Sequence, residues 1–515
     1  MSWRDLSVGH VVALALIVTA LLGVLALPTP YMGDQADFAY GAKVIRDGGV
    51  YYRDFWDNKQ PGIYLFFLVG GTLFGFSETG VHLLEWLWQL VCAAALTWLA
   101  LKCVSRPRIA ALASISTIGL YFAVVTRWQM TKVEPLIALP VVLMVVFAYK
   151  LLRSPKPHFW GLAFGLSVGV LILFKILYAP LSLGIAAVTV VHLYRGGFGD
   201  PSRKTLHLGA GALVGALMVV TPVVIYYASR GALHDLIWVT FGYPVEALGE
   251  VDVAPLSRLF ASGKWLLGVS GAFLPFAFLG LISLRKAREP FIAGCFAVYG
   301  AMLIPLVLIQ KFSWWEYHFL LFLIPIGFFS VLGLDRLQSI LSATAVARLD
   351  RILVGAAFLA LPLLTILLGV TRKSVLLIQA LANPIEAPVS VKIDDQYLTY
   401  WFETDFLRSG EPPNDDGEIY VFGDPRILWL SGRRQAIPPS GTGWEMYTDS
   451  QWRNLPVDLR RELPSFVYVG DEYADLILRR SPATARLLET FYRSSSSNRA
   501  LLGTWFERSE LLPEE

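Results

Sequence analysis

The stretch that decides the fold runs from residue 33 to residue 62 and reads GDQADFAYGAKVIRDGGVYYRDFWDNKQPG. It gathers aspartates, lysines and arginines directly after the first long apolar segment of a chain that otherwise avoids charge. Hydrophobic residues make up 55% of the 515 residues, charged residues only 16%, and the mean hydropathy is +0.55. This composition is typical of a polytopic membrane protein. Charge concentrated beside a membrane-spanning helix therefore indicates a functional site.

The membrane topology follows from the lengths of the apolar segments and from the positions of Lys and Arg. A helix needs roughly twenty mostly apolar residues to cross the hydrocarbon, and Lys and Arg favour cytoplasmic loops. We expect about eleven spans with the N-terminus inside, near residues 11–27, 80–101, 108–125, 134–152, 158–175, 179–194, 207–229, 264–284, 290–309, 318–334 and 352–371. The exported parts are then residues 28–79, 126–133, 230–263, 310–317 and the tail after Thr371.

The length of two apolar segments does not by itself show how they sit in the membrane. The run Gly62 to Phe76 is short and rich in glycine. As a span it would place basic clusters such as Arg285, Lys286 and Arg288 outside, so we expect an interfacial or re-entrant helix. The first apolar segment has no small-residue cleavage site before the polar loop, and we expect it to remain as a membrane anchor.

The tail from Arg372 to Glu515 changes to a polar composition rich in Asp, Glu, Pro and Ser. We therefore expect two domains, a membrane domain over residues 1–371 and a soluble extracytoplasmic α/β domain over residues 372–515, whose role the sequence leaves open. The expected elements are strands at Glu418–Phe422 and Ser465–Val469 and helices at Ala474–Arg480 and Thr484–Tyr492, with a strand-to-helix loop at Gly423-Asp424-Pro425.

The three cysteines and the net charge exclude several classes of protein. Cys92, Cys103 and Cys295 lie in or beside expected spans, so they indicate neither a disulfide framework nor a thiol-based metal site. The net charge is only +3 and there is no basic arm, which argues against a nucleic-acid partner.

The exported loop carries the candidate catalytic carboxylates. Asp34 opens an expected short helix that runs to about Lys43 and stops at Gly48-Gly49. A spacing of three places Asp34 and Asp37 on one face of that helix. The alternatives are structural: Asp34 as a helix N-cap, and Asp57 with Lys59 as a solvated pair worth under about 1 kcal/mol.

Other exported connections carry cations. Arg127, Lys132 and Glu134 occur in RWQMTKVEP, Lys311 and His318 in QKFSWWEYH, and Lys175 in the apolar run LFKILY. A single lysine at a helix end is explained by snorkelling to the interface. Several cations at one membrane face are suited to a lipid phosphate. We expect these cations and the acidic loop to meet in one pocket.

These motifs, in this order, resemble a known group. GDQADFAYGAKVIRDGG, YYRDFWDNKQPG, RWQMTKVEP, the Phe-Lys at 174–175 and WEYHFLLFLIP are similar to the bacterial relatives of the dolichyl-phosphate-mannose protein mannosyltransferases and the lipid A aminoarabinose transferases. Those proteins are membrane glycosyltransferases of the GT-C fold. The resemblance covers about residues 10–370. It departs from the group at Lys59-Gln60-Pro61, where many members have His-Pro-Pro or Lys-Pro-Pro, and at Asp34-Gln35, which alters the common acidic pair.

The resemblance implies an inverting transfer of a hexosyl or pentosyl group from a polyprenyl-phosphate carrier to an acceptor hydroxyl of an envelope glycan, lipid or protein. Such a reaction needs a base on the acceptor and cations on the phosphate leaving group. The expected base is Asp34, with Asp37 or Asp57 as alternates. The remaining expected site residues are Lys59, Arg127, Lys175, Lys311 and His318 at the donor phosphate, and Glu134, Trp315 and Tyr317 at the acceptor or sugar, where the aromatic rings alternatively belong to the interfacial belt.

The resemblance also implies a bacterial cytoplasmic (inner) membrane location with the site outside. It favours metal-independent members, although three aspartates offer oxygen ligands, so no cofactor is expected beyond the lipid-linked donor. Two other classes remain open: a transporter or flippase of a lipid-linked sugar, and a non-catalytic scaffold for envelope assembly. The identities of sugar and acceptor and the carrier length depend on pocket shape, which the sequence does not specify.

Overall fold

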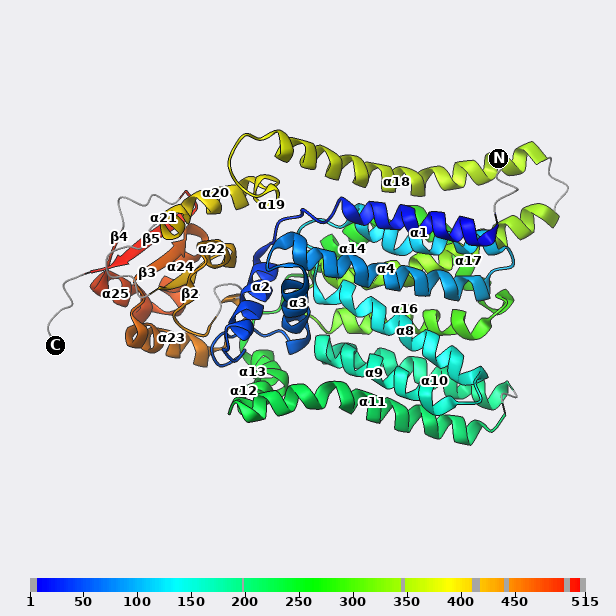
Figure 1. The fold of residues 1–515 in the computed structure, drawn as a ribbon, viewed down its shortest axis with the longest axis horizontal. Coiled ribbons are helices and arrows are strands. Elements are labelled where there is room, and N and C mark those ends of the chain that lie inside the picture. Colours follow the sequence, from blue (N-terminus) through cyan, green and yellow to red (C-terminus); the bar gives the residue numbers. More distant parts are fainter. Residues whose placement is uncertain are drawn as a thin grey trace. The chain divides into compact units, whose positions relative to one another are not determined.

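The computed structural model describes residues 7–196, 199–343, 348–409, 417–439, 444–494 and 501–509. The chain divides into two compact units (Figure 1). The membrane unit comprises Met1–Leu27, His82–Val223 and Val253–Leu377. The loop-and-tail unit comprises Pro28–Val81, Val224–Asp252 and Ile378–Glu515.

The membrane unit is helical. Its elements are α1 (Val8–Val24), α4 (Glu78–Cys103), α5 (Pro107–Ala110), α6 (Leu112–Ser114), η1 (Ile115–Gly119), α7 (Leu120–Val124), α8 (Val133–Arg153), α9 (Pro157–Lys175), η2 (Ile176–Tyr178), α10 (Ala179–Arg195), α11 (Pro201–Ser229), α14 (Leu256–Ser270), η4 (Gly271–Phe273), α15 (Leu274–Ile282), η5 (Leu284–Lys286), α16 (Pro290–Leu308), η6 (Glu316–Phe322), α17 (Leu323–Ala343) and α18 (Arg348–Ala382).

The expected spans are confirmed. Nine helical ranges of the described residues are long and apolar enough to cross a membrane. One of them, Pro157–Arg195, covers two expected spans, α9 and α10, and the backbone is extended at Lys175 between them (φ −167°, ψ 103°). The remaining expected span coincides with α1, an apolar helix of 17 residues.

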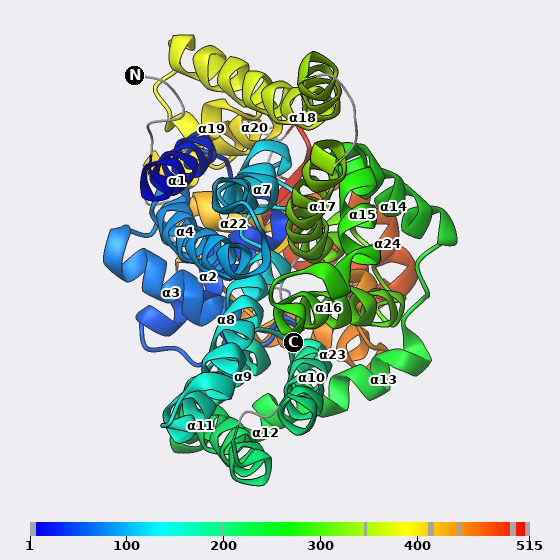
Figure 2. The same cartoon turned by 90° about the vertical axis from the view of Figure 1, so that its right-hand side faces the viewer.

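Glycines allow α15 and α17 to pack closely, and the two helices lie side by side in Figure 2. A Cβ added to Gly333 would come within 1.9 Å of the Phe276 carbonyl oxygen, and one added to Gly280 within 2.0 Å of the Phe329 carbonyl oxygen. Small residues at such crossings are the usual way for membrane helices to bring their backbones together.

The loop-and-tail unit contains helices and a mixed sheet. Its elements are α2 (Gly33–Arg46), α3 (Pro61–Phe74), α12 (Leu233–Ile237), η3 (Trp238–Gly242), α13 (Tyr243–Glu250), α19 (Val389–Lys392), α20 (Asp395–Glu403), α21 (Asp405–Ser409), β1 (Glu418–Phe422), α22 (Pro425–Ser431), β2 (Arg434–Gln435), η7 (Trp444–Met446), α23 (Asp449–Glu462), β3 (Phe466–Gly470), α24 (Asp471–Arg480), α25 (Pro482–Phe491), β4 (Tyr492–Ser494) and β5 (Gly503–Arg508).

The exported loop folds largely as its sequence predicts. The helix α2 ends at Arg46, and Gly48 follows with a positive φ of 92°. The N-cap is Met32, whose backbone N–H donates to the Gln35 side chain, so Asp34 lies in the first turn and is not the cap. The glycine-rich run forms α3, which begins with Pro61 and has only 14 residues. Its interfacial or re-entrant placement stays a prediction.

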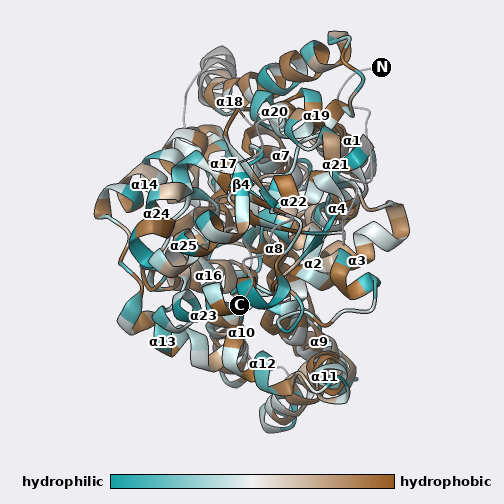
Figure 3. Ribbon diagram, turned by 90° about the vertical axis from the view of Figure 1, so that its left-hand side faces the viewer, coloured by the Kyte–Doolittle hydropathy of each residue, from teal (hydrophilic) through white to brown (hydrophobic). Residues whose placement is uncertain are grey.

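The tail contains the expected small α/β arrangement. The strand order is β2-β1-β3-β5-β4, with β1 parallel to β2 and β3, and β5 antiparallel to β3 and β4. The loop after β1 leads into α22, where Asp424 caps the helix by accepting from the Arg426 N–H. Figure 3 shows that the surrounding helices mix hydrophilic and hydrophobic residues, as expected of a domain with one polar face.

The tail and the exported loop are bonded to each other within this unit. The Gln435 N–H donates to the Tyr40 hydroxyl at 2.6 Å, and the Trp56 N–H donates to the Pro438 carbonyl at 2.6 Å. The Tyr397 hydroxyl also donates to the Glu78 carboxylate. The sequence places a domain boundary at residue 371, whereas the compact units group the tail with the loop.

Candidate functional site

The exported loop holds a partly buried ion pair, in which the Lys59 side chain is 30% exposed. The Lys59 ammonium lies 3.3 Å from an Asp57 carboxylate oxygen and 2.8 Å from the Asn58 side-chain oxygen. The other Asp57 oxygen accepts from the Tyr64 hydroxyl at 2.6 Å, and the Asn58 N–H donates to Asp57 at 2.6 Å. The Asp57 residue is only 7% exposed. The Asp57 carboxylate is therefore bonded by neighbouring groups of the loop, and charge-assisted bonds of this kind hold Lys59 in place.

Three nearby carboxylates raise the pKa of Lys59. Burial lowers the pKa of its ammonium, but the negative charges of Asp57, Asp34 and Asp37 outweigh that effect and hold the pKa above its usual range. Lys59 therefore remains a cation in an acidic surrounding. Asp37 is 2% exposed, while Asp34 is half-buried at the start of α2. Asp34 is thus the carboxylate of this group most open to an incoming molecule.

Tyrosines fix the path of the loop. The Tyr52 hydroxyl donates to the Lys59 carbonyl at 2.7 Å, and the Tyr51 hydroxyl to the Asp57 carbonyl at 3.2 Å. The Tyr51 and Tyr64 rings also pack with their centroids 3.8 Å apart. These contacts hold Asp57 and Lys59 in one geometry. The pair is therefore more ordered than the solvated surface pair that the sequence left as an alternative.

A second polar cluster lies in the membrane unit around Glu134, in the first turn of α8. One Glu134 oxygen accepts from the Lys175 ammonium at 2.8 Å and lies 2.9 Å from His318 Nδ1. Glu134 is 1% exposed, and the Lys175 side chain is 26% exposed. The structure therefore brings three of the expected site residues together, from helices far apart in the sequence.

Further residues complete this cluster that the sequence did not indicate. The Gln310 side-chain oxygen accepts from Lys175 at 2.6 Å, and its amide donates to the Tyr178 hydroxyl at 3.2 Å. The Ser313 hydroxyl lies 2.9 Å from His318 Nε2. Neutral polar residues in loops give no sequence signal, so only the fold could reveal these partners.

The buried Glu85 supports the neighbouring loop. It accepts from the Thr131 hydroxyl at 2.6 Å, from the Thr131 N–H at 3.3 Å and from the Tyr121 hydroxyl. Thr131 has a positive φ of 50°, and these bonds hold that uncommon conformation just before Lys132 and Glu134. A carboxylate inside the apolar run of α4 was a signal that the sequence offered.

Among the described residues, the remaining expected residues of the membrane unit do not bond directly to Glu134. The Tyr317 ring meets the His318 ring edge-on with centroids 4.4 Å apart, and the Lys132 ammonium lies 5.1 Å from the Tyr317 ring. Lys311 lies over the Phe312 ring, the Arg258 guanidinium lies 4.1 Å from the 40%-exposed Trp315 ring, and Arg127 is half-buried. Neither the Lys311 nor the Trp315 contact involves a carboxylate. The expectation that the loop carboxylates and these cations share one pocket stays a prediction.

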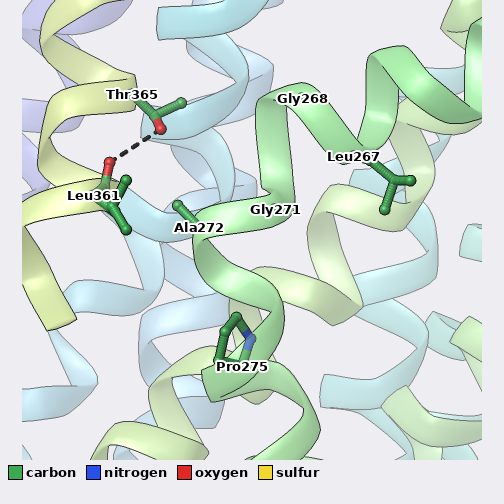
Figure 4. A pocket seen from close by; sticks show the side chains of 7 residues that line it. All are labelled: Leu267, Gly268, Gly271, Ala272, Pro275, Leu361 and Thr365. Carbon is green, nitrogen blue, oxygen red and sulfur yellow. Dashed lines mark hydrogen bonds between the residues drawn. The ribbon is translucent and has the colours of Figure 1, made fainter.

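Two further features bear on ligands. Among the residues that the structure describes, no group of three or more His, Cys, Asp or Glu is placed to hold a metal ion. A cavity of about 490 Å³ in the membrane unit is shown in Figure 4. Its lining is Leu267, Gly268, Gly271, Ala272, Pro275, Leu361 and Thr365. None of these lining side chains is charged, and the Thr365 hydroxyl is bonded to the Leu361 carbonyl, so the lining offers no cation to a phosphate.

Solved structures share this architecture. ArnT from Cupriavidus metallidurans bound to undecaprenyl phosphate aligns with a TM-score of 0.65 and 15% identity over 98% of both chains. The apo form of ArnT aligns with a TM-score of 0.59 and 15% identity over 96% of each chain. No family model and no curated protein sequence matches the chain. ArnT is a lipid A aminoarabinose transferase of the GT-C fold, and this chain is an integral membrane protein with that same fold.

Proposed function

We propose that this protein is a GT-C glycosyltransferase that moves a sugar from a polyprenyl-phosphate carrier to an acceptor hydroxyl at the outer face of a bacterial cytoplasmic membrane. The acceptor is an envelope glycan, lipid or protein, and the N-terminus lies inside. The observation that carries the proposal is the ArnT likeness, which extends over 98% of the chain and includes a structure bound to undecaprenyl phosphate.

The acidic cluster of the loop supports Asp34 as the base. Asp57 already accepts bonds from Tyr64, Asn58 and Lys59, and Asp37 is buried. Asp34 keeps partial access to solvent at the start of α2.

The chemistry is a single displacement. The acceptor hydroxyl oxygen forms a bond to the anomeric carbon, the bond from that carbon to the phosphate oxygen breaks, and the hydroxyl proton passes to Asp34. The leaving polyprenyl phosphate retains the electron pair of the broken bond. One displacement inverts the anomeric configuration.

The Glu134 cluster supports a site for the phosphate. Lys175 remains partly exposed while it is bonded to Glu134 and Gln310, so its ammonium is oriented and still accessible to an anion. Glu134 then acts as a positioning residue for Lys175 and His318, and a direct contact with the sugar is not needed. Cations fixed before the reaction stabilise the developing phosphate charge most effectively.

Sugar transfer in nanodiscs tests the proposal. Radiolabelled undecaprenyl-phosphate sugars are incubated with wild-type protein and with extracted envelope lipids and glycans as acceptors. We expect Asp34→Asn to lower kcat by about 100-fold or more while binding of undecaprenyl phosphate is retained.

The matched control is Asp54→Asn. It removes a carboxylate of the same loop that pairs with Arg53 and accepts from the Val50 N–H. Its transfer rate should stay within a few-fold of wild type. Full activity of Asp34→Asn would refute the assignment of the base. Movement of the labelled lipid across the bilayer without transfer would instead favour a flippase.

A further inference from the structure

The segment between two candidate spans forms a continuous helix. It consists of α12, η3 and α13, Leu233 to Glu250. The span Pro201–Ser229 ends just before it, and the span Leu256–Ile282 begins just after it. Both connections, residues 230–232 and 251–255, are too short to carry the helix far from the bilayer.

One face of this helix packs against the exported loop and the tail. Val239, Tyr243 and Ala247 on this face are 2%, 4% and 2% exposed. The Tyr243 hydroxyl donates to the Met446 carbonyl at 2.7 Å and accepts from the Asn58 amide at 3.4 Å. The helix therefore contacts the residue that lies between Asp57 and Lys59.

The polar ends of the same face are bonded to the start of α23. Glu246 accepts from the Ser450 hydroxyl at 2.9 Å, and Glu250 accepts from the Asp449 N–H at 2.7 Å. Both acidic side chains are thereby turned toward protein partners, which leaves the opposite face apolar.

That opposite face is an uncovered apolar stripe. Ile237, Phe241, Val245 and Leu248 are 51%, 60%, 70% and 58% exposed. Steps of four, four and three residues place their side chains on one side of a helix. Figure 3 shows hydrophobic and hydrophilic residues together along α13. Four large apolar side chains in water would be costly, so this stripe requires a partner.

We infer that α12–η3–α13 lies in the plane of the membrane interface, with Ile237, Phe241, Val245 and Leu248 inserted among the lipids. The bilayer is the occupant because the helix begins and ends at spans that are themselves embedded in it. An in-plane helix with one apolar face is a recognised interfacial element. Through the bond between Tyr243 and Asn58, this helix would hold the exported loop at the depth where a lipid headgroup lies.

Spin labels at single cysteines test the insertion without any activity assay. Phe241→Cys and Val245→Cys report on the stripe. The matched control is Val457→Cys on α23, because Val457 is 64% exposed on a helix of the same unit. The native Cys92, Cys103 and Cys295 are buried, and the unsubstituted protein is the labelling blank.

Each label is measured in nanodiscs for collision with oxygen, which concentrates in lipid, and with a water-soluble nickel chelate. We expect the ratio of oxygen to nickel collision to be several-fold higher at positions 241 and 245 than at 457. Nickel collision at 241 and 245 equal to that at 457 would overturn the inference. Protection from both reagents would also overturn it, because a protein partner would then cover the stripe. Neither result depends on sugar transfer.

Discussion

Replacing Glu134 with glutamine keeps the shape of the side chain but removes the negative charge beside Lys175 and His318. Its oxygen lies 2.8 Å from Lys175 Nζ and 2.9 Å from His318 Nδ1, and the residue is 1% exposed. Removing one partner of a buried ion pair costs about 3–5 kcal/mol, since the other charge is left uncompensated. Lys175 is 26% exposed, so water offsets part of that cost, and we expect a loss of about 3 kcal/mol.

The free energy of unfolding is measured by SDS titration in mixed micelles, with tryptophan fluorescence as the signal. A double-mutant cycle adds Lys175→Met and the combined variant. We expect the combined variant to be more stable than additivity predicts by about 1–3 kcal/mol, because it removes both charges together. The control is Glu316→Gln, which neutralises a glutamate near His318 outside this network and should change stability by less than about 0.5 kcal/mol.

Two results would refute this reasoning. A loss below about 1 kcal/mol for Glu134→Gln would show that the carboxylate does not balance a buried cation. Additive effects of Glu134→Gln and Lys175→Met would show that the two side chains do not interact. Either result would also remove the support that this cluster gives to a phosphate site.

Three further changes test the loop and the helix packing. Tyr64→Phe removes the hydroxyl that donates to Asp57 and should cost about 1.5–3 kcal/mol in SDS titration; an unchanged value would contradict the bond. The pKa of Asp54 is lowered, chiefly by the bond from Arg53, so its contribution to stability is present above the unfolded pKa of about 3.9 and is lost as pH falls through the lower folded pKa. The thermal midpoint should therefore fall less between pH 6 and pH 3 in Asp54→Asn than in wild type, and equal falls would argue against this pair. Gly333→Ala should destabilise the protein by more than about 2 kcal/mol, whereas Gly263→Ala, whose added Cβ meets nothing within 4 Å, should change stability by less than about 0.5 kcal/mol; equal effects would contradict the close helix crossing.

The sequence was most informative where the structural signal is local. The apolar segments predicted the helices at all eleven expected spans, and the short apolar run that forms the 14-residue α3 was also expected to be helical. The stop of α2 at Gly48 and the first strand of the tail were also predicted, because glycine and short β-branched runs act within a few residues. The start of α2 differed only in its cap, because the helix begins at Gly33 with Met32 as its N-cap, which places Asp34 inside the first turn.

The partners of the charged residues could not be predicted in the same way. Glu134 and His318 are 184 residues apart in the sequence, and Lys175 and Gln310 are 135 apart. The sequence explained Lys175 either by snorkelling or by phosphate binding. The structure adds that Glu134 and Gln310 hold the ammonium, which depends on α8, α9 and the connection after α16 meeting.

The same dependence applies to Asp34, whose position is set from the far end of the chain. Arg426 is 1% exposed and is paired with Asp424 at 2.6 Å and with Asp394 at 3.4 Å. Its guanidinium also donates to the Met32 sulfur at 3.6 Å, two residues before Asp34. A buried and fully bonded arginine cannot shift without breaking its ion pairs. The tail therefore contacts the N-cap of α2 through a buried arginine, which makes the tail part of the surroundings of the proposed base.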